Sequence, residues 1–328
     1  MLNRKFELQK LLAPAVLVML YIFFSIFGTN FFSTDYLMNI LNASYFIGFM
    51  AIGVTFVIIT GGIDLSLGTT MMCGALLGAT AYSNWGWNIW LSLAFCVFVA
   101  TVIGSINGTL IAYLKLPPFI ATLGMQMIGM GFGAIITKVV TKRFPTIGTP
   151  DAAFKYVFYK SSNTAAIPGF PTGALWLAGA FIVAYILLNH TKFGRYTYAL
   201  GSNYEAARLS GINVRKWQLL IYTFCGFFSG LAGVFYAAVY TSVIPATGNG
   251  LELLAIAGVV IGGTSMIGGS GSLMGTIIGV FVMSVLKQGL MSMGLQGHWQ
   301  IFFTGIVVIG AVLLDQYRLK KASQVKRV

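Results

Sequence analysis

Charged residues are scarce in this chain. Aspartate, glutamate, lysine and arginine make up 8% of the 328 residues, and only seven residues are acidic. Soluble globular domains carry roughly 25% charged residues. Hydrophobic residues make up 57% of the sequence, and apolar runs near the ~20 residues needed to cross a bilayer recur from end to end. The composition therefore excludes a soluble globular domain and predicts a polytopic integral membrane protein.

The chain also has few residues that could perform covalent chemistry. Its three cysteines, Cys73, Cys96 and Cys225, fall in apolar runs, which predicts buried thiols rather than a disulfide framework or a metal site. Its two histidines, His190 and His298, lie at the edges of apolar runs without metal-ligand spacing. No phosphate-binding loop of the GxxxxGKS or GxxxxGKT type occurs. We therefore expect no catalytic residue, no metal, no cofactor, and no ATP bound in that way.

The apolar runs define one all-α transmembrane domain over residues 1–328. Eight runs are long enough to span a bilayer: Leu11–Phe27, Ile40–Thr60, Ile89–Leu114, Phe119–Thr137, Ala174–Leu188, Trp217–Tyr240, Leu273–Met293 and Trp299–Leu314. Two shorter runs, Gly68–Ala81 and Leu253–Ile267, adjoin glycine-rich stretches. The chain crosses the membrane ten times if both short runs span, and eight times if neither does.

Basic residues gather between the apolar runs and near both ends of the chain, where they are Arg4, Lys5, Lys10, Arg318, Lys320, Lys321, Lys326 and Arg327. Cytoplasmic segments carry the excess of lysine and arginine, so both termini are predicted to be cytoplasmic. Ten crossings place 14 of the 20 lysines and arginines inside, 5 outside and Lys287 within a span, whereas eight crossings place 13 inside and 6 outside. Both counts agree with the rule, which therefore does not choose between them. The net charge of +13 reflects this arrangement and does not indicate nucleic-acid binding.

A glycine-rich break interrupts the apolar sequence at "GGIDLSLG", residues 61–68. Irregular backbone inside a membrane is tolerated where it is packed in protein or lines a watery cavity. The candidate translocation-path or helix-break residues here are Gly61, Gly62, Asp64, Ser66 and Gly68. The carboxyl group of Asp64 has two compatible interpretations. It lines or gates the path, or it caps a helix predicted over residues 65–81 by accepting hydrogen bonds from free backbone N–H groups.

A second break, residues 262–271, is loosely similar to the first and lies about 200 residues further on. Short, glycine-interrupted segments in corresponding halves indicate the substrate path of transporters. The candidate residues of this break are Gly262, Gly263, Thr264 and Gly269. Glu252 precedes it, and we expect Glu252 to start a short helix and to lie nearer water than Asp64.

Two hydrophilic loops separate the spans. Residues 138–173 contain four prolines and several aromatic residues, which predicts a structured loop. Residues 190–216 contain Asn203 followed by "YEAARL", a sequence typical of a helix start with Glu205 in the first turn. Gly211 is expected to end that helix. The sequence therefore predicts a short helix between two spans, which would be either a docking element or a solvated interfacial helix without a partner.

Four motifs resemble the permease subunits of ribose/galactose/xylose-type ATP-binding-cassette sugar importers. They are "GGIDLSLG" at 61–68, "LPPFIATLGM" at 116–125, "TKFGRYTYALGSNYEAARLSGINV" at 191–214 and "VVIGGTSMIGGSGSLMGTIIG" at 259–279. They occur in order and cover most of the chain. Departures from the family pattern occur at Met130, Ser202 and Leu254, the first and last of which replace charged residues found in many members.

The resemblance implies a dimer, with a second copy or a paralogue, that works with an ATPase subunit and an extracytoplasmic sugar-binding protein in a prokaryotic inner membrane. It also implies that loop 190–216 is the cytoplasmic ATPase-coupling loop, that loop 138–173 is extracytoplasmic, and that there are ten crossings. The ATPase-coupling residues would be Gly201, Asn203, Glu205, Ala206, Ala207, Arg208 and Gly211.

Other functions remain open at this stage. A permease for a nucleoside or a branched-chain amino acid is the nearest alternative, and an ion-coupled secondary transporter with Asp64 as its ion site is a more distant one. A non-transporting scaffold would leave the glycine breaks unexplained. Trp85, Trp87 and Trp90 cluster between two apolar runs, as expected for contact with membrane lipid at headgroup level.

Overall fold

The protein is mainly helical in the part described by a computed structural model, which covers residues 12–162, 165, 169–295 and 297–325. The helices are α2 (Leu12–Phe27), α3 (Thr34–Ile59), α4 (Leu67–Ser83), α5 (Ile89–Ala112), α6 (Pro118–Ile136), α7 (Ala153–Phe158), α8 (Thr172–His190), α9 (Lys192–Ser202), α10 (Tyr204–Leu209), α11 (Val214–Tyr240), α12 (Leu251–Ile261), α13 (Leu273–Ser292) and α14 (Gly297–Val325). A 3-10 turn, η1 (Pro150–Ala152), precedes α7. Strands β1 (Lys142–Arg143) and β2 (Ser242–Val243) form a two-residue antiparallel pair. The prediction of an all-α polytopic membrane protein is confirmed.

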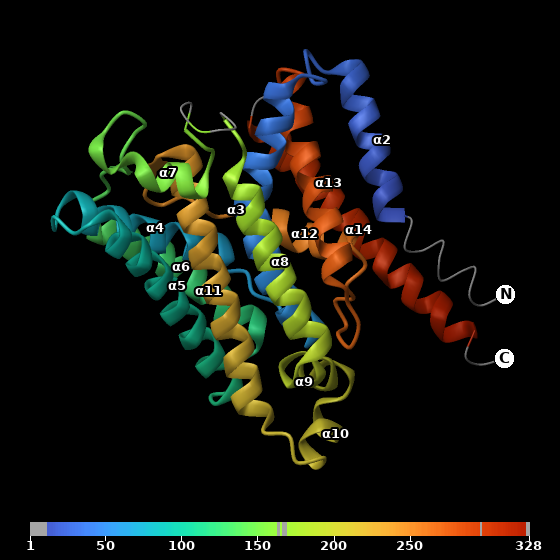
Figure 1. Cartoon of the computed structure of the whole chain (residues 1–328). Coiled ribbons are helices and arrows are strands. Elements are labelled where there is room, and N and C mark those ends of the chain that lie inside the picture. The colour runs from blue at the N-terminus through green and yellow to red at the C-terminus, as the bar shows by residue number, and fades with distance from the viewer. Residues whose placement is uncertain (1–11, 163–164, 166–168, 296, 326–328) are drawn as a thin grey trace.

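The long helices run between two ends of the molecule, which we name the α7 end and the α10 end (Figure 1). The loop between α6 and α8 and the strand pair lie at the α7 end. Helices α9 and α10 lie at the α10 end, where α8 leads into them and α11 leaves them (Figure 1). The two loops singled out in the sequence are therefore at opposite ends. The basic residues at positions 4, 5, 10, 326 and 327 lie outside the described residues, as do the side chains of positions 318, 320 and 321.

Seven of the described helices are long and apolar enough to cross a membrane: α3, α5, α6, α8, α11, α13 and residues 297–317 of α14. Helix α2 has 16 residues and α12 has only 11. At 1.5 Å per residue, α12 is about 16 Å long, which is half of a ~30 Å hydrocarbon core. The expected short segment Leu253–Ile267 is wrong at both ends, because α12 runs from Leu251 to Ile261. The count of ten crossings stays a prediction.

Polar caps lengthen two of the spans beyond their apolar runs. Helix α3 begins at Thr34 rather than Ile40 because the side chain of Ser33 accepts a hydrogen bond from the backbone N–H of Tyr36. Helix α11 begins at Val214 rather than Trp217 because Asn213 accepts one from Lys216. Hydropathy alone misses these first turns because they are polar, although their backbone is helical.

Glycines set the close packing of the helices. A methyl group on Gly104 of α5 would lie 2.7 Å from Cα of Gly226 on α11. Helices α12 and α13 approach each other in the same way, since Gly258 faces Gly279 and Gly262 faces Gly275. Within a bilayer, where apolar burial does not drive helices together, small residues permit the close approach that stabilises their association. Helix α3 lies at the centre, and its apolar window is completely buried.

Candidate translocation site and coupling junction

The two glycine breaks contact each other at the α10 end. The backbone N–H of Gly269 donates a 2.8 Å hydrogen bond to the carbonyl oxygen of Ile59, the last residue of α3. Gly61, Gly268 and Gly269 have φ angles of +75°, +94° and +73°, which glycine adopts readily and other residues rarely do. Segments that lie about 200 residues apart in the sequence thus form one structural unit.

Helix α9 packs directly onto this unit. A methyl group on Gly201 would clash with the Ile59 carbonyl oxygen and the Gly269 backbone nitrogen. The hydroxyl of Tyr198 donates a 2.9 Å hydrogen bond to the Gly271 carbonyl oxygen. We name this contact among residues 59–62, 198–202 and 268–271 the coupling junction. It joins three of the motifs that the sequence singled out.

The rest of the second break ends α12. Gly262 is the C-cap residue of that helix, and Gly263 follows with a φ of +92°. The Thr264 side chain is fully buried, and its hydroxyl oxygen accepts a 3.4 Å hydrogen bond from the Ser272 backbone N–H. These predicted residues therefore terminate a helix and close the loop that leads to α13.

Asp64 lies in the first break and is 2% exposed. Its Oδ1 accepts hydrogen bonds from the Ser66 backbone N–H at 2.9 Å and from the Ser66 hydroxyl at 2.6 Å. The same hydroxyl oxygen accepts a 2.9 Å bond from Nδ2 of Asn107 on α5. These bonds tie the turn before α4 to α5.

The capping interpretation of Asp64 needs correction. Helix α4 begins at Leu67 instead of Leu65, and its N-cap position is Ser66, which makes no side-chain capping bond. Asp64 lies two residues before that position and accepts from one backbone N–H, that of Ser66. This is the local turn that aspartate forms with the backbone two residues on. Asp64 therefore shapes the approach to α4 and does not cap the helix itself.

Glu252 is also buried, with 3% of its surface exposed against 2% for Asp64, so both carboxyl groups lie away from solvent. Its Oε1 accepts from the Gly250 backbone N–H at 2.9 Å and from Nε2 of Gln126 at 3.0 Å. Nε2 of Gln126, on α6, also donates to Oδ1 of Asn249 at 2.9 Å. These bonds hold Glu252 and the residues before α12 against α6, and the carboxyl group is therefore buried.

The first turns of α4 and α12 meet. A methyl group on Gly68 would clash with the Gly248 carbonyl oxygen and would lie 2.7 Å from Oε2 of Glu252. Two short helices therefore present their N-termini to each other beside two buried carboxyl groups. Helix N-termini carry partial positive charge and free N–H groups. This polar cluster, made by Asp64, Ser66, Asn107, Gln126, Asn249 and Glu252, is the candidate translocation site.

The helix predicted after Asn203 is present as α10. The Asn203 side chain accepts a 2.9 Å hydrogen bond from the Ala206 backbone N–H, which confirms the N-cap. Glu205 and Arg208 form an exposed ion pair at 2.7 Å. Gly211 follows the helix with a φ of +82°, as expected for a stop. The α10 end also exposes the Leu209 side chain, 81% of which is accessible.

The remaining α10 residues divide between the two faces of the helix. Ala206 is exposed, whereas Ala207 is buried against Leu200 of α9 and Val214 of α11. Helix α10 therefore packs on α9 and on the start of α11 through this apolar contact. Helix α9 was missed in the sequence, where loop 190–216 was assigned a single short helix. Its sequence begins with the polar "KFGRYTY" and has no long apolar run.

Comparison with known proteins identifies the family of the chain. The model of the family described as branched-chain amino acid transport system / permease component matches residues 36–312. The chain belongs to this permease family. It is 37% identical over 313 residues to the ribose import permease protein RbsC of Escherichia coli K12, a match that covers 94% of this chain and 93% of that protein.

Other relatives of the permease are similar over comparable lengths. It is 38% identical over 309 residues to ribose import permease protein RbsC of Bacillus subtilis 168, covering 94% of this chain and 93% of that protein. It is 35% identical over 298 residues to fructose import permease protein FrcC of Rhizobium meliloti, covering 91% and 82%. No solved structure matches the permease.

Several polar residues of the permease were not identified from the sequence. Asn107 and Gln126 lie within apolar runs, and a polar side chain at that depth is a signal that could have identified them. Asp315 of α14 is 7% exposed, and its Oδ2 accepts from the Ser265 hydroxyl at 3.3 Å and from the Met266 backbone N–H at 3.2 Å. The last helix thereby holds the loop of the second break.

Proposed function

We propose that the permease forms the translocation path of an ATP-driven, binding-protein-dependent importer of a monosaccharide. The relatives that carry this proposal are named import permeases for ribose and for fructose. A separate ATPase subunit hydrolyses ATP, and an extracytoplasmic binding protein delivers the sugar. The working unit contains two permease chains, either two copies or this chain with a paralogue.

The coupling junction is the observation that best supports a mechanism. Helix α10, with its exposed Leu209 and its capped start, is the docking element for the ATPase. Helix α9 connects it to both glycine breaks, which in turn hold the end of α3 and the loop between α12 and α13. ATP binding moves the ATPase subunits together, pushes α10, and shifts α9 as a rigid body. The breaks then change the positions of α4 and α12, so that the path opens alternately to either face.

The polar cluster at the start of α4 and α12 is the central part of the path. Backbone N–H groups at the two helix starts and the side chains of Asn107, Gln126 and Asn249 offer hydrogen-bond donors and acceptors of the kind that a sugar hydroxyl uses. Asp64 and Ser66 keep the start of α4 in place beside it. The permease needs no high affinity for the sugar, because the binding protein supplies affinity.

Reconstitution tests this function. The permease, its cognate ATPase and its binding protein are placed in vesicles, and uptake of labelled D-ribose and D-fructose is measured. We expect uptake that requires ATP and the loaded binding protein and that continues without an ion gradient. Uptake driven by a sodium or proton gradient without ATP would contradict the proposal and favour a secondary transporter.

Cysteine labelling tests the ten-crossing topology. A cysteine at Ser202, in loop 190–216, is expected to react with a membrane-impermeant reagent only from the cytoplasmic side, and one at the exposed Thr146 only from outside. The native thiols at positions 73, 96 and 225 are buried and should give little background. Labelling of position 202 from outside would exclude the proposed orientation.

A further inference from the structure

A lysine lies inside the span α13 without a counter-charge. Lys287 is mostly buried, and no hydrogen bond or ion pair joins it to any other described residue. Its recorded contact is with the face of Phe46 on α3, where Nζ lies 5.1 Å from the ring centroid. An ionisable side chain within a membrane is costly and faces protein or water. A cation on an aromatic face recovers only part of that cost, so packing alone is a weak reason for a lysine here.

Two tyrosines surround the same aromatic ring. Tyr236 and Tyr240 of α11 contact Phe46 edge to face, with centroids 5.6 Å and 6.1 Å away. Tyr240 is 40% exposed and Tyr236 is half-buried. Within the described part of the chain, neither hydroxyl has a hydrogen-bond partner. The Phe46 ring itself is buried, so the accessible part of the cluster is the Tyr240 side chain, and the two hydroxyl groups are unused.

A buried acceptor lies one turn from Phe46 on the same helix. Asn42 is 7% exposed, and its Oδ1 has no hydrogen-bond partner among the described residues. Positions four apart on a helix share a face, so Asn42 and Phe46 lie on the same side of α3. A buried amide oxygen without a partner costs roughly as much as a lost hydrogen bond. It is a second, independent sign that a polar molecule belongs at this place.

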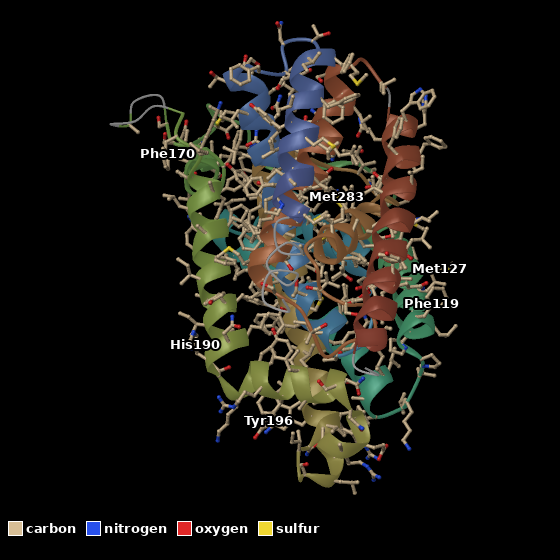
Figure 2. The ribbon with its side chains drawn as sticks, turned by 90° about the vertical axis from the view of Figure 1, so that its right-hand side faces the viewer. Phe119, Met127, Phe170, His190, Tyr196 and Met283 are labelled. Atoms are coloured by element: carbon tan, nitrogen blue, oxygen red, sulfur yellow. The ribbon has the colours of Figure 1, made fainter. Side chains whose placement is uncertain are left out.

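The cluster lies on the side of the candidate translocation site nearer the α7 end. Figure 2 labels Met283 in the upper half of the molecule, and Lys287 follows it by one turn toward Ser292. Tyr240 is the last residue of α11, next to the strand β2 that pairs with β1 in the loop between α6 and α8. Under the proposed orientation, a solute released by the binding protein meets this cluster before it reaches the buried carboxyl groups.

We propose that Lys287, Tyr236, Tyr240 and Asn42, which lie around the buried Phe46 ring, form an entry subsite that contacts the sugar. The exposed part of the Tyr240 ring offers an aromatic surface to the C–H side of a sugar ring, and a few placed polar groups orient the ligand, as in other small-molecule sites. The lysine ammonium donates up to three hydrogen bonds, the tyrosine hydroxyls donate or accept, and the asparagine oxygen accepts. This set of groups fits an uncharged polyhydroxylated ring. The inference rests on the proposed function, which supplies the class of solute.

Deoxy sugars test the subsite directly. Uptake of D-ribose and of its monodeoxy analogues is measured in vesicles that contain the complete transporter, with each sugar preloaded at saturation on the binding protein. The variants are Lys287→Met, which keeps side-chain length, and Lys287→Arg, which keeps the charge. Tyr240→Phe removes one hydroxyl, and Lys115→Met removes an exposed lysine elsewhere as a control.

We expect Lys287→Met to lower D-ribose uptake about tenfold, which corresponds to ~1.4 kcal/mol, while ATPase stimulation stays within about twofold of wild type. The ratio of uptake between D-ribose and one deoxy analogue should shrink by a similar factor. Lys287→Arg should restore part of the uptake, Tyr240→Phe should alter the ratio for a different analogue, and Lys115→Met should match wild type.

Two outcomes overturn the subsite alone. One is a Lys287→Met variant with wild-type uptake. The other is a variant in which uptake and ATPase stimulation fall together with the sugar ratio unchanged, because that pattern reports a structural role. A wild-type transporter that imports no monosaccharide overturns the proposed function, and the subsite with it.

Discussion

The coupling junction makes a sharp prediction for the substitution Gly201→Ala. The added methyl group would meet the carbonyl oxygen of Ile59 and the backbone nitrogen of Gly269. Both are backbone atoms of packed segments, so neither can move aside as the tip of a flexible side chain would. The helix position itself favours alanine over glycine by roughly 0.5–1 kcal/mol. Overpacking costs about 1–3 kcal/mol, so we expect a net loss on the order of 1–2 kcal/mol in the stability of the junction.

A matched control separates packing from helix propensity. Gly179 lies in α8, and a methyl group there would have no neighbour within 4 Å. Gly179→Ala thus has the same gain in intrinsic helix propensity as Gly201→Ala, without the steric clash. Both variants are reconstituted with the ATPase and the binding protein, and uptake is normalised to inserted permease. The loss of 1–2 kcal/mol corresponds to about a 5- to 30-fold change in the ratio of the intact to the disrupted coupling junction.

We expect Gly201→Ala to lower ATP-driven uptake by about that factor while ATP hydrolysis is less affected, because the ATPase would still dock on α10. Gly179→Ala should behave as wild type. Wild-type uptake and coupling in Gly201→Ala would refute the reasoning, since a methyl group would then fit between α9 and the two breaks. An equal loss in both variants would refute it as well.

Three further predictions concern single side chains. Asp64→Asn should keep most of the uptake, because its Oδ1 can still accept a hydrogen bond from Ser66. Asp64→Leu should lose uptake, because it leaves the Ser66 backbone N–H unpaired at a cost of roughly 1–3 kcal/mol. An inactive but well-inserted Asn variant would show instead that the negative charge is required. Burial lowers the pKa of Lys155, in the loop between α6 and α8, from 10.5 to about 8, so the folded loop favours the neutral amine. Thermal stability should therefore rise as the pH is raised from about 8 to 10.5, where Lys155 binds a proton in the unfolded chain but not in the folded one. This rise should be absent in Lys155→Met. Equal dependence of stability on pH in both proteins would contradict the prediction. Glu205→Lys replaces the exposed ion-pair partner of Arg208 by a residue of like charge. Binding of the ATPase, measured by pull-down from vesicles, should weaken while membrane insertion is normal. Unchanged ATPase binding and uptake would show that α10 is not part of the docking surface.

The class of protein follows from composition and order along the chain. Length and spacing of apolar runs are local properties, because each span must satisfy its own backbone hydrogen bonds within lipid. The same holds for the start of α10, where the capping side chain of Asn203 and the bonded N–H of Ala206 are three residues apart. Four motifs in sequence were enough to recognise the family, which the comparisons then showed.

Errors arose where a polar segment folds against the rest of the protein. Helix α9 has no long apolar run, and its place is set by the contact of Gly201 and Tyr198 with distant loops. Glu252 also depends on a partner that lies far away in the sequence. Its actual burial depends on Gln126, 126 positions earlier, and no local pattern contains that pairing.

The sequence by itself determined that the protein is an all-α membrane permease, where its long apolar helices lie, and where the backbone must break. Those features depend on hydrophobicity, glycine and capping residues within a few positions of one another. Only the tertiary structure decided that the two breaks touch, that α9 lies against both, and that Asp64 and Glu252 flank the facing starts of α4 and α12. The physical reason is that these contacts join backbone atoms and small residues far apart in the chain, where close approach depends on how whole helices pack.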